Sequence, residues 1–94
     1  MKLVMIVIFG LLSTGLSAST TILFLGDSLS EGLGVDESQS FPRVVEFKLR
    51  EKKQDVQIIN GGVSGATTAS GEWRLLWHSK KKLDILILEL GAND

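Results

Sequence analysis

Residues 21–30, which read TILFLGDSLS, constrain the fold of this chain more than any other stretch. They begin with Thr21 and then four consecutive apolar residues, Ile22, Leu23, Phe24 and Leu25. A short continuous apolar run of this kind is typical of a strand that is buried on both faces of a parallel sheet. Gly26 ends the run, and a polar turn with Ser28 follows it. Because ligands bind at the carboxyl ends of strands in open α/β sheets, this turn presents a serine hydroxyl at a favourable position for chemistry.

The composition limits the chain to one small domain of ordinary globular type. It has 94 residues, of which 44% are hydrophobic and 22% are charged. The formal net charge of -1 and the pI near 5.8 argue against a strongly basic face, so we expect small-molecule partners and no nucleic acid. The absence of cysteine excludes a disulfide framework, a thiolate nucleophile and a zinc–thiolate site.

Residues 1–18 have the pattern of a targeting segment. Lys2 gives a positive start, residues 3–12 form a largely apolar core, and small residues lead to Ala18 as at a signal-peptidase site. The alternative is a transmembrane anchor, but the apolar run is shorter than the roughly 20 residues that a span needs. We therefore predict a signal peptide over residues 1–18, a mature domain over residues 19–94, periplasmic or secreted localisation, and no stable membrane anchor after cleavage.

After the first turn, the pattern predicts a loop, a helix and a second strand. The loop, residues 31–39, is rich in glycine and acidic residues and is expected to rim the site. The helix follows Ser40, which can cap it. Its apolar positions are Phe41, Val44, Val45 and Leu49, and its water-facing positions are Arg43, Glu46, Lys48 and Arg50. The strand contains Val56 and Ile58 and is ended by the strong breaker at residues 60–62.

A second helix and a third strand complete the pattern. The helix covers about residues 68–82, with Trp73 and Trp77 on the apolar stripe and Arg74 off it. The strand, residues 83–90, is nearly all aliphatic and is expected to be buried like the first. Strands that alternate with helices of these lengths predict right-handed βαβ units and a parallel sheet that is covered by helices on both faces.

The loop after the second strand does not match a nucleotide-binding motif. Residues 60–70 read NGGVSGATTAS, and their glycines let the backbone approach a ligand closely. A Walker loop needs G-x-x-x-x-G-K-[ST] and a dinucleotide loop needs G-x-G-x-x-G, and neither spacing occurs here. The sequence therefore predicts no nucleotide cofactor.

A polar cluster follows each of the three predicted strands. If the strands are parallel, Ser28, Gly65 and Asn93 emerge at the same edge of the sheet. A serine that attacks an ester carbonyl creates an oxyanion, which needs two or three fixed hydrogen-bond donors. The backbone N–H groups of Ser28 and Gly65 and the amide of Asn93 could supply them. Each residue also has a purely structural explanation, as a turn former, a permissive turn glycine or a helix cap.

The order and spacing of these clusters resemble the GDSL, or SGNH, hydrolase family. Residues 26–30 (GDSLS) match its first block with the nucleophile at Ser28, Gly65 matches the glycine of the second block, and residues 91–94 (GAND) match the third. The resemblance covers nearly all of the chain after residue 18. It is closest to the secreted arylesterase, lysophospholipase and thioesterase I branch of the family.

The resemblance implies a flavodoxin-like three-layer α/β/α fold and a serine hydrolase that needs no metal and no cofactor. Such an enzyme cleaves small acyl esters, thioesters or lysophospholipids through an acyl-serine intermediate. The resemblance also implies that Ser28 is the nucleophile and that Ser28, Gly65 and Asn93 supply the oxyanion donors.

The chain departs from the family pattern at two points. Close relatives often carry Asp where this chain has Ala66, and the family's D-x-x-H block does not occur before Asp94. His78, the only histidine, falls within the second predicted helix and is interpreted as a surface or boundary residue. We therefore expect residues 19–94 to be the amino-terminal part of a hydrolase domain. The alternative is a non-catalytic fragment or a binding module on the same fold.

Three carboxylates near the predicted strand ends have local interpretations. Asp27 and Asp94 are interpreted as hydrogen-bonding residues of their turns rather than as triad acids. Glu89 stands in an apolar strand, where a buried unpaired charge is costly, so we expect it near the strand end with a hydrogen-bond partner or water. A catalytic role for Glu89 stays open at this point.

Overall fold

The protein is built on a three-stranded parallel sheet. The computed structural model describes residues 19–94, so the predicted signal peptide lies outside the described residues. The strands are β1 (Thr20–Gly26), β2 (Val56–Gly62) and β3 (Ile85–Glu89), in the order β2-β1-β3. Both pairings are parallel, which confirms the predicted sheet and places β1 at its centre.

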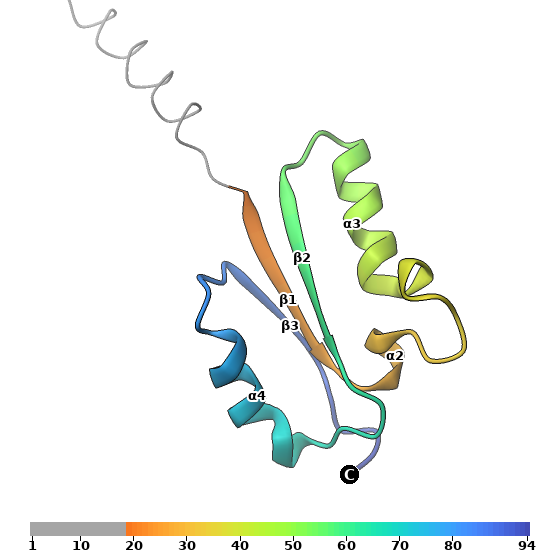
Figure 1. Cartoon of the computed structure of the whole chain (residues 1–94), viewed down its shortest axis with the longest axis vertical. Coiled ribbons are helices and arrows are strands. Elements are labelled where there is room, and N and C mark those ends of the chain that lie inside the picture. Colours follow the sequence, from red (N-terminus) through yellow and green to blue (C-terminus); the bar gives the residue numbers. More distant parts are fainter. Residues whose placement is uncertain (1–18) are drawn as a thin grey trace, which may run out of the picture.

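Helices cover both faces of this sheet. Figure 1 shows α3 (Phe41–Glu51) on one side and α4 (Gly71–His78) on the other. A short helix, α2 (Ser28–Glu31), follows β1 directly, and two 3-10 segments precede the longer helices, η1 (Glu37–Gln39) and η2 (Thr68–Ser70). The arrangement confirms the expected three-layer α/β/α architecture.

The centre of the core is β1, as its continuous apolar run predicted. Leu23 and Leu25 are 0% and 1% exposed, and their neighbours on the strand point to the opposite face. On that second face a cluster forms from β1, β2 and α3. Its members are Ile22, Phe24, Val56 and Ile58, with Val45 and Leu49 packed against them.

The prediction that the third strand is buried like the first is wrong for the described part of the chain. The side chains from Ile85 to Leu88 are between 40% and 63% exposed. β3 pairs only with β1, so its outer edge has no strand partner within residues 19–94. In addition, α3 packs on β2 and leaves the β3 side of its own face open. An apolar strand sequence therefore reports that a strand can be buried, while its position in the sheet decides whether it is.

β2 continues through the glycines at which the sequence predicted it to end. Gly61 and Gly62 pair with Leu25 and Gly26 in the ladder. An added Cβ on Gly62 would lie 2.7 Å from the Cα of Glu31 and 2.7 Å from the carbonyl carbon of Ser30. The glycine is needed here because α2 lies directly against the strand backbone, and not because the chain turns.

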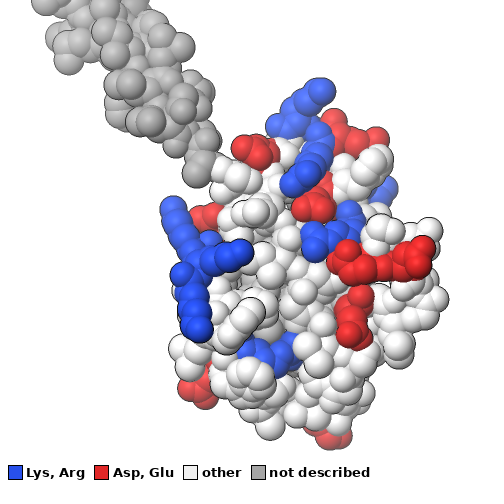
Figure 2. Space-filling model, viewed as in Figure 1, with Lys and Arg blue, Asp and Glu red and all other residues white. Residues whose placement is uncertain are grey.

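The outer edge of β2 is closed by charged side chains that were expected to face water. Arg43 Nη1 donates to the carbonyl of Ile58 at 3.0 Å, and Glu46 Oε2 accepts from the N–H of Ile58 at 3.3 Å. One turn further along α3, Arg50 Nη2 donates to the carbonyl of Val56 at 3.0 Å. Figure 2 shows basic and acidic side chains next to one another over α3. These contacts occupy the backbone groups that an exposed edge strand would offer to another chain.

The other expectations for the start of α3 also need correction. Ser40 Oγ donates to the carbonyl of Glu37 at 2.7 Å and makes no side-chain cap of α3. Phe41 and Val44, predicted on the buried stripe, are 41% and 40% exposed. The rotation of α3 that brings Arg43 and Glu46 to the edge of β2 carries Val44 outward, whereas the ring of Phe41 still packs edge-on against the buried Phe24, with 5.5 Å between the ring centroids.

The second helix is shorter than predicted and turned about its axis. Arg74 is 6% exposed, whereas Trp73 and Trp77 are 62% and 59% exposed. The guanidinium Nη2 of Arg74 donates to the carbonyls of Gly26, at 3.0 Å, and Gly61. A charged donor satisfies these carbonyls at the ends of β1 and β2, so the arginine side of α4 packs inward and the tryptophans face out.

We expect Gly62→Ala to destabilise the full-length protein by about 3 kcal/mol or more, because the added methyl group would overlap the backbone of α2 and not a movable side chain. Gly34→Ala is the matched control. Gly34 has φ of 91° but open space around its Cα, so its replacement should cost only the left-handed conformation, about 1–2 kcal/mol. Urea unfolding of both variants measures the difference. A loss for Gly62→Ala no larger than for Gly34→Ala would contradict the close approach of α2.

Candidate active site

The turn after β1 places Ser28 at the first position of α2. Asp27 caps this helix, and its Oδ1 accepts from the N–H of Leu29 at 2.9 Å. Asp27 is 1% exposed, while Ser28 is half-buried. In Figure 1, α2 lies near the lower end of the sheet. Within residues 19–94, neither the N–H nor the hydroxyl of Ser28 has a hydrogen-bond partner. The turn therefore presents both groups unpaired, while the residue before Ser28 is fixed by the cap.

Asn93 joins the turn of Ser28 to the loop of Gly65. Its Nδ2 donates to the carbonyl of Ala66 at 3.1 Å and to Oδ2 of Asp27 at 3.5 Å. The three residues predicted to meet at one edge of the sheet are thus brought together by contacts of their immediate neighbours. The bond to Ala66 uses a backbone carbonyl, so the absence of Asp at that position does not remove it.

Gly65 lies in an open part of its loop. Its φ is 79°, and no heavy atom lies within 4 Å of an ideal Cβ at this position. The loop is held to α2 by Glu31, whose Oε2 accepts from the N–H of Ser64 at 3.1 Å and from the Ser64 hydroxyl. A left-handed glycine without a side chain leaves its N–H accessible to a ligand.

The peptide bond between Gly26 and Asp27 is held from both ends. Its carbonyl accepts from Arg74 Nη2 at 3.0 Å and from the N–H of Val63 at 3.1 Å. Its N–H donates to Oε1 of Glu89 at 3.3 Å. This peptide precedes Ser28 by one residue, so the direction of the serine turn depends on side chains from α4 and β3.

Glu89 makes a second contact with the same turn. Its Oε1 also accepts from the hydroxyl of Ser30, which is 0% exposed, at 2.9 Å. The expectation that Glu89 has hydrogen-bond partners near the strand end is confirmed, and its position is that of a support beneath the turn. The role of Arg74 was missed, because in the sequence it looked like one of several charged residues on the outer face of a helix.

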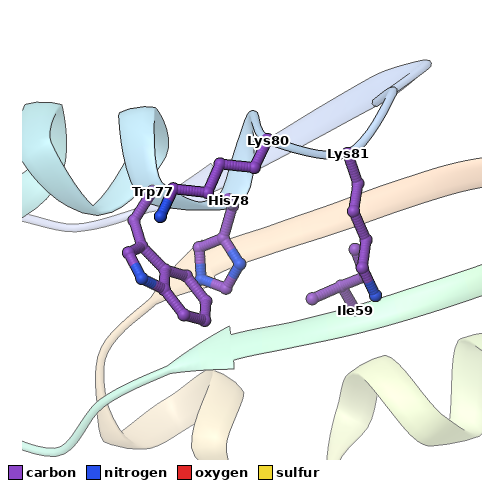
Figure 3. A pocket seen from close by; sticks show the side chains of 5 residues that line it. All are labelled: Ile59, Trp77, His78, Lys80 and Lys81. Atoms are coloured by element: carbon purple, nitrogen blue, oxygen red, sulfur yellow. The ribbon is translucent and has the colours of Figure 1, made fainter.

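Asp94 and His78 have the local roles that the sequence suggested. Asp94 accepts from the N–H of Thr68 at 2.9 Å and from its hydroxyl at 2.8 Å, and these two bonds lower the pKa of Asp94. His78 is the last residue of α4 and points toward β2, beside Gly61 (Figure 3). Burial lowers the pKa of His78, and the positive charge of Arg74 lowers it further. No hydrogen bond joins His78 to Ser28 within residues 19–94.

Two other kinds of feature are absent from the described residues: a metal-binding cluster and a membrane-spanning helix. Among residues 19–94 there is no cluster of three or more His, Cys, Asp or Glu side chains that could hold a metal ion. None of the helices in this part of the chain has the length and apolar character that a membrane crossing needs.

The serine turn, the glycine loop and the asparagine occur together in a known family. The model of the GDSL-like lipase/acylhydrolase family matches residues 24–94. The chain belongs to this family. It is 42% identical to an arylesterase of Vibrio mimicus over 94 residues, which cover 99% of this chain and 47% of that protein.

Two further relatives agree with this assignment. The chain is 36% identical to Esterase TesA of Pseudomonas aeruginosa over 84 residues, which cover 88% of this chain and 42% of that protein. The crystal structure of AlinE4, an SGNH-hydrolase family esterase, matches with a TM-score of 0.76 and 41% identity, covering 84% of this chain and 43% of that one. The chain therefore spans less than half the length of these relatives. The match with AlinE4 confirms the predicted SGNH hydrolase fold.

We expect Glu89→Ala to lower the free energy of unfolding of the full-length protein by about 1–3 kcal/mol, because it leaves the N–H of Asp27 and the hydroxyl of Ser30 unpaired. Glu89→Gln keeps an oxygen acceptor and should retain most of the stability. Glu51→Ala, at the exposed end of α3, is the matched control and should change stability by less than about 0.5 kcal/mol. Equal stability of the alanine and glutamine variants at position 89, measured by denaturant unfolding, would contradict the supporting role.

Proposed function

We propose that the full-length protein is a serine hydrolase that cleaves small acyl esters through an acyl-serine intermediate at Ser28. Membership of the GDSL-like lipase/acylhydrolase family supports this proposal, as do relatives that are named as esterases. The observation that carries it is the contact of Asn93 with both Asp27 and Ala66, because it gathers the serine turn and the glycine loop around one point.

In the proposed reaction the Oγ of Ser28 attacks the ester carbonyl while its proton passes to a histidine base. The Oγ–carbon bond forms, the carbonyl oxygen becomes an oxyanion, and the bond to the leaving alcohol breaks as the alcohol takes up the proton. Water then repeats these steps on the acyl-serine and releases the acid. The base is assigned to the D-x-x-H block that the family resemblance implies, since His78 makes no contact with Ser28.

The oxyanion is stabilised in this proposal by three donors. The N–H groups of Ser28 and Gly65 have no partner within residues 19–94, which supports their assignment. Asn93 donates one amide hydrogen to Ala66 at 3.1 Å, and its other contact, with Asp27, is long at 3.5 Å. The weakly held hydrogen is the one that can turn to a developing charge.

The substrate class and the location of the protein belong to the same proposal. Esters with small acyl groups, thioesters and lysophospholipids all offer the carbonyl that Ser28 requires, and the names of the relatives include an arylesterase and a thioesterase that is also called a lysophospholipase. The targeting pattern of residues 1–18 supports export and cleavage, so the enzyme acts in the periplasm or outside the cell.

We expect a fluorophosphonate probe to label Ser28 in the full-length protein, because this serine combines a strand-end position with nearby oxyanion donors. Ser28→Ala should abolish both the label and the hydrolysis of short-chain esters. Ser38→Ala, at an exposed position of η1, is the matched control and should retain both, as judged by mass spectrometry and a turnover assay. Turnover by Ser28→Ala would refute the assignment, and a folded protein that is neither labelled nor active would favour the non-catalytic binding module.

We expect Asn93→Ala to lower kcat of the full-length enzyme by about 10²–10³, with a much smaller change in KM, because the amide acts only as charge develops on the oxygen. Since Asn93 also holds Ala66 and Asp27, unfolding of the variant is measured alongside the kinetics. Nearly unchanged turnover in a folded variant would make Asn93 a purely structural link.

A further inference from the structure

A groove runs along the flank of α4, between this helix and the segment formed by β2 and the loop after it. It consists of three adjoining cavities of about 380, 240 and 290 Å³. The first lies at the loop of Gly65, the second shares Trp73 with the first, and the third shares Trp77 with the second and ends at Lys80 and Lys81. We refer to this continuous surface, from Gly65 to Lys81, as the α4 groove.

The two tryptophans form the apolar side of the α4 groove. Trp73 and Trp77 are 62% and 59% exposed and lie one helical turn apart on α4, on the flank of the helix next to the buried Arg74. Val63, at the Gly65 end, is 48% exposed. Large apolar side chains that are exposed along one continuous groove mark a binding surface more often than single exposed residues do. A helix of eight residues gives this surface a length of about 12 Å.

The far end of the α4 groove is positively charged. Lys80 extends back over Trp77, with its Nζ 5.9 Å from the ring centroid, and Lys81 reaches down toward Ile59 of β2 (Figure 3). Figure 2 shows the basic side chains as a patch at the turn after α4. Within the described residues, neither Lys80 nor Lys81 forms an ion pair, while Lys82 lies 3.9 Å from Asp84.

No acidic residue lines the end of the α4 groove that holds these lysines, and the carboxylate of Glu31 is bonded to Ser64 at the opposite end. None of the residues that line the three cavities is acidic. Arg74 adds a further positive charge beneath the tryptophans, and its Nη1 is buried without a hydrogen-bond partner within residues 19–94. His78, whose pKa is lowered by burial, contributes a mainly neutral ring at pH 7. An occupant with an apolar body and an anionic end complements both the surface and the charge.

We propose that the α4 groove binds a single amphiphile whose aliphatic chain lies on Trp73 and Trp77 and whose anionic group meets Lys80 and Lys81. A substrate held in this way would bring an ester at the opposite end of its chain to the loop of Gly65. Only this last assignment rests on the proposed function. Because lysines line one end of the groove only, the proposed occupant is a monomeric amphiphile and not a membrane surface.

Trp73 and Trp77 are the two tryptophans of the 94-residue sequence, so the emission change that is absent from the Trp73→Phe, Trp77→Phe variant of the full-length protein reports on the occupant of the groove. We expect dodecyl phosphate, added to the full-length protein below its micelle concentration, to shift the emission to the blue in a saturable manner. It should bind about tenfold tighter than the neutral dodecyl maltoside, because two exposed ammonium groups meet the phosphate. Trp77→Ala, followed through Trp73, should weaken the binding of both amphiphiles.

The double variant Lys80→Ala, Lys81→Ala tests the charged end. It should lose the preference for dodecyl phosphate and keep the binding of dodecyl maltoside. The matched control is Lys48→Ala, Lys52→Ala, which removes the same charge from exposed positions on α3 and should keep the preference. The proposal would be overturned if the Lys80→Ala, Lys81→Ala variant kept its preference for dodecyl phosphate over dodecyl maltoside. It would also be overturned if this preference fell equally in both double variants. Binding to anionic vesicles without saturable binding of the monomer would overturn it as well.

These measurements separate the groove from the proposed reaction. Binding is measured on Ser28→Ala protein as well, which should bind dodecyl phosphate like the unaltered protein. Intact ester hydrolysis without saturable amphiphile binding would refute amphiphile binding at the α4 groove and leave the proposed function standing. If the protein binds dodecyl phosphate in a saturable, lysine-dependent manner but hydrolyses no ester, amphiphile binding at the α4 groove is supported and the proposed function is refuted.

Discussion

The hydrogen bonds around the peptide bond between Gly26 and Asp27 are the contacts on which the candidate site depends. Arg74 and Val63 donate to its carbonyl, and Glu89 accepts from its N–H. These partners come from α4, from the loop after β2 and from β3, so one peptide unit is tied to three later parts of the chain. An unpaired buried peptide group costs about 1–3 kcal/mol, so these hydrogen bonds offset part of the cost of burying the charged Arg74.

Charged side chains also satisfy backbone groups at the outer edge of β2. Arg43, Glu46 and Arg50 bond to the strand's outer backbone groups, while the outer edge of β3 has no strand partner within residues 19–94. The two edges of the sheet therefore differ in chemistry. Pairing with another strand is blocked at β2 and open at β3, so any further growth of this sheet is directed to one side.

The orientation of α4 links the serine turn to the surface outside it. Because Arg74 turns inward to reach the ends of β1 and β2, Trp73 and Trp77 must lie on the outer side of the helix. The same rotation that secures the turn before Ser28 creates the apolar side of the α4 groove. The loop of Gly65 lies at the meeting point of the two regions, since it contributes to the first cavity of the groove and is joined to the serine turn through Asn93.

The sequence by itself determined the alternation of strands and helices, the parallel sheet with a buried first strand, and the meeting of the turns that carry Ser28, Gly65 and Asn93. Apolar runs and strand-end turns are recognised from neighbouring residues alone, so they can be predicted without knowledge of the tertiary structure. Only the tertiary structure decided which way α4 faces, that β2 passes through Gly62, and that β3 lies at an exposed edge. A helix pattern assumes that the apolar stripe packs inward. Here Arg74 packs inward instead, because it donates to the carbonyls of Gly26 and Gly61. These two carbonyls lie close together only once β1 and β2 are paired in the sheet.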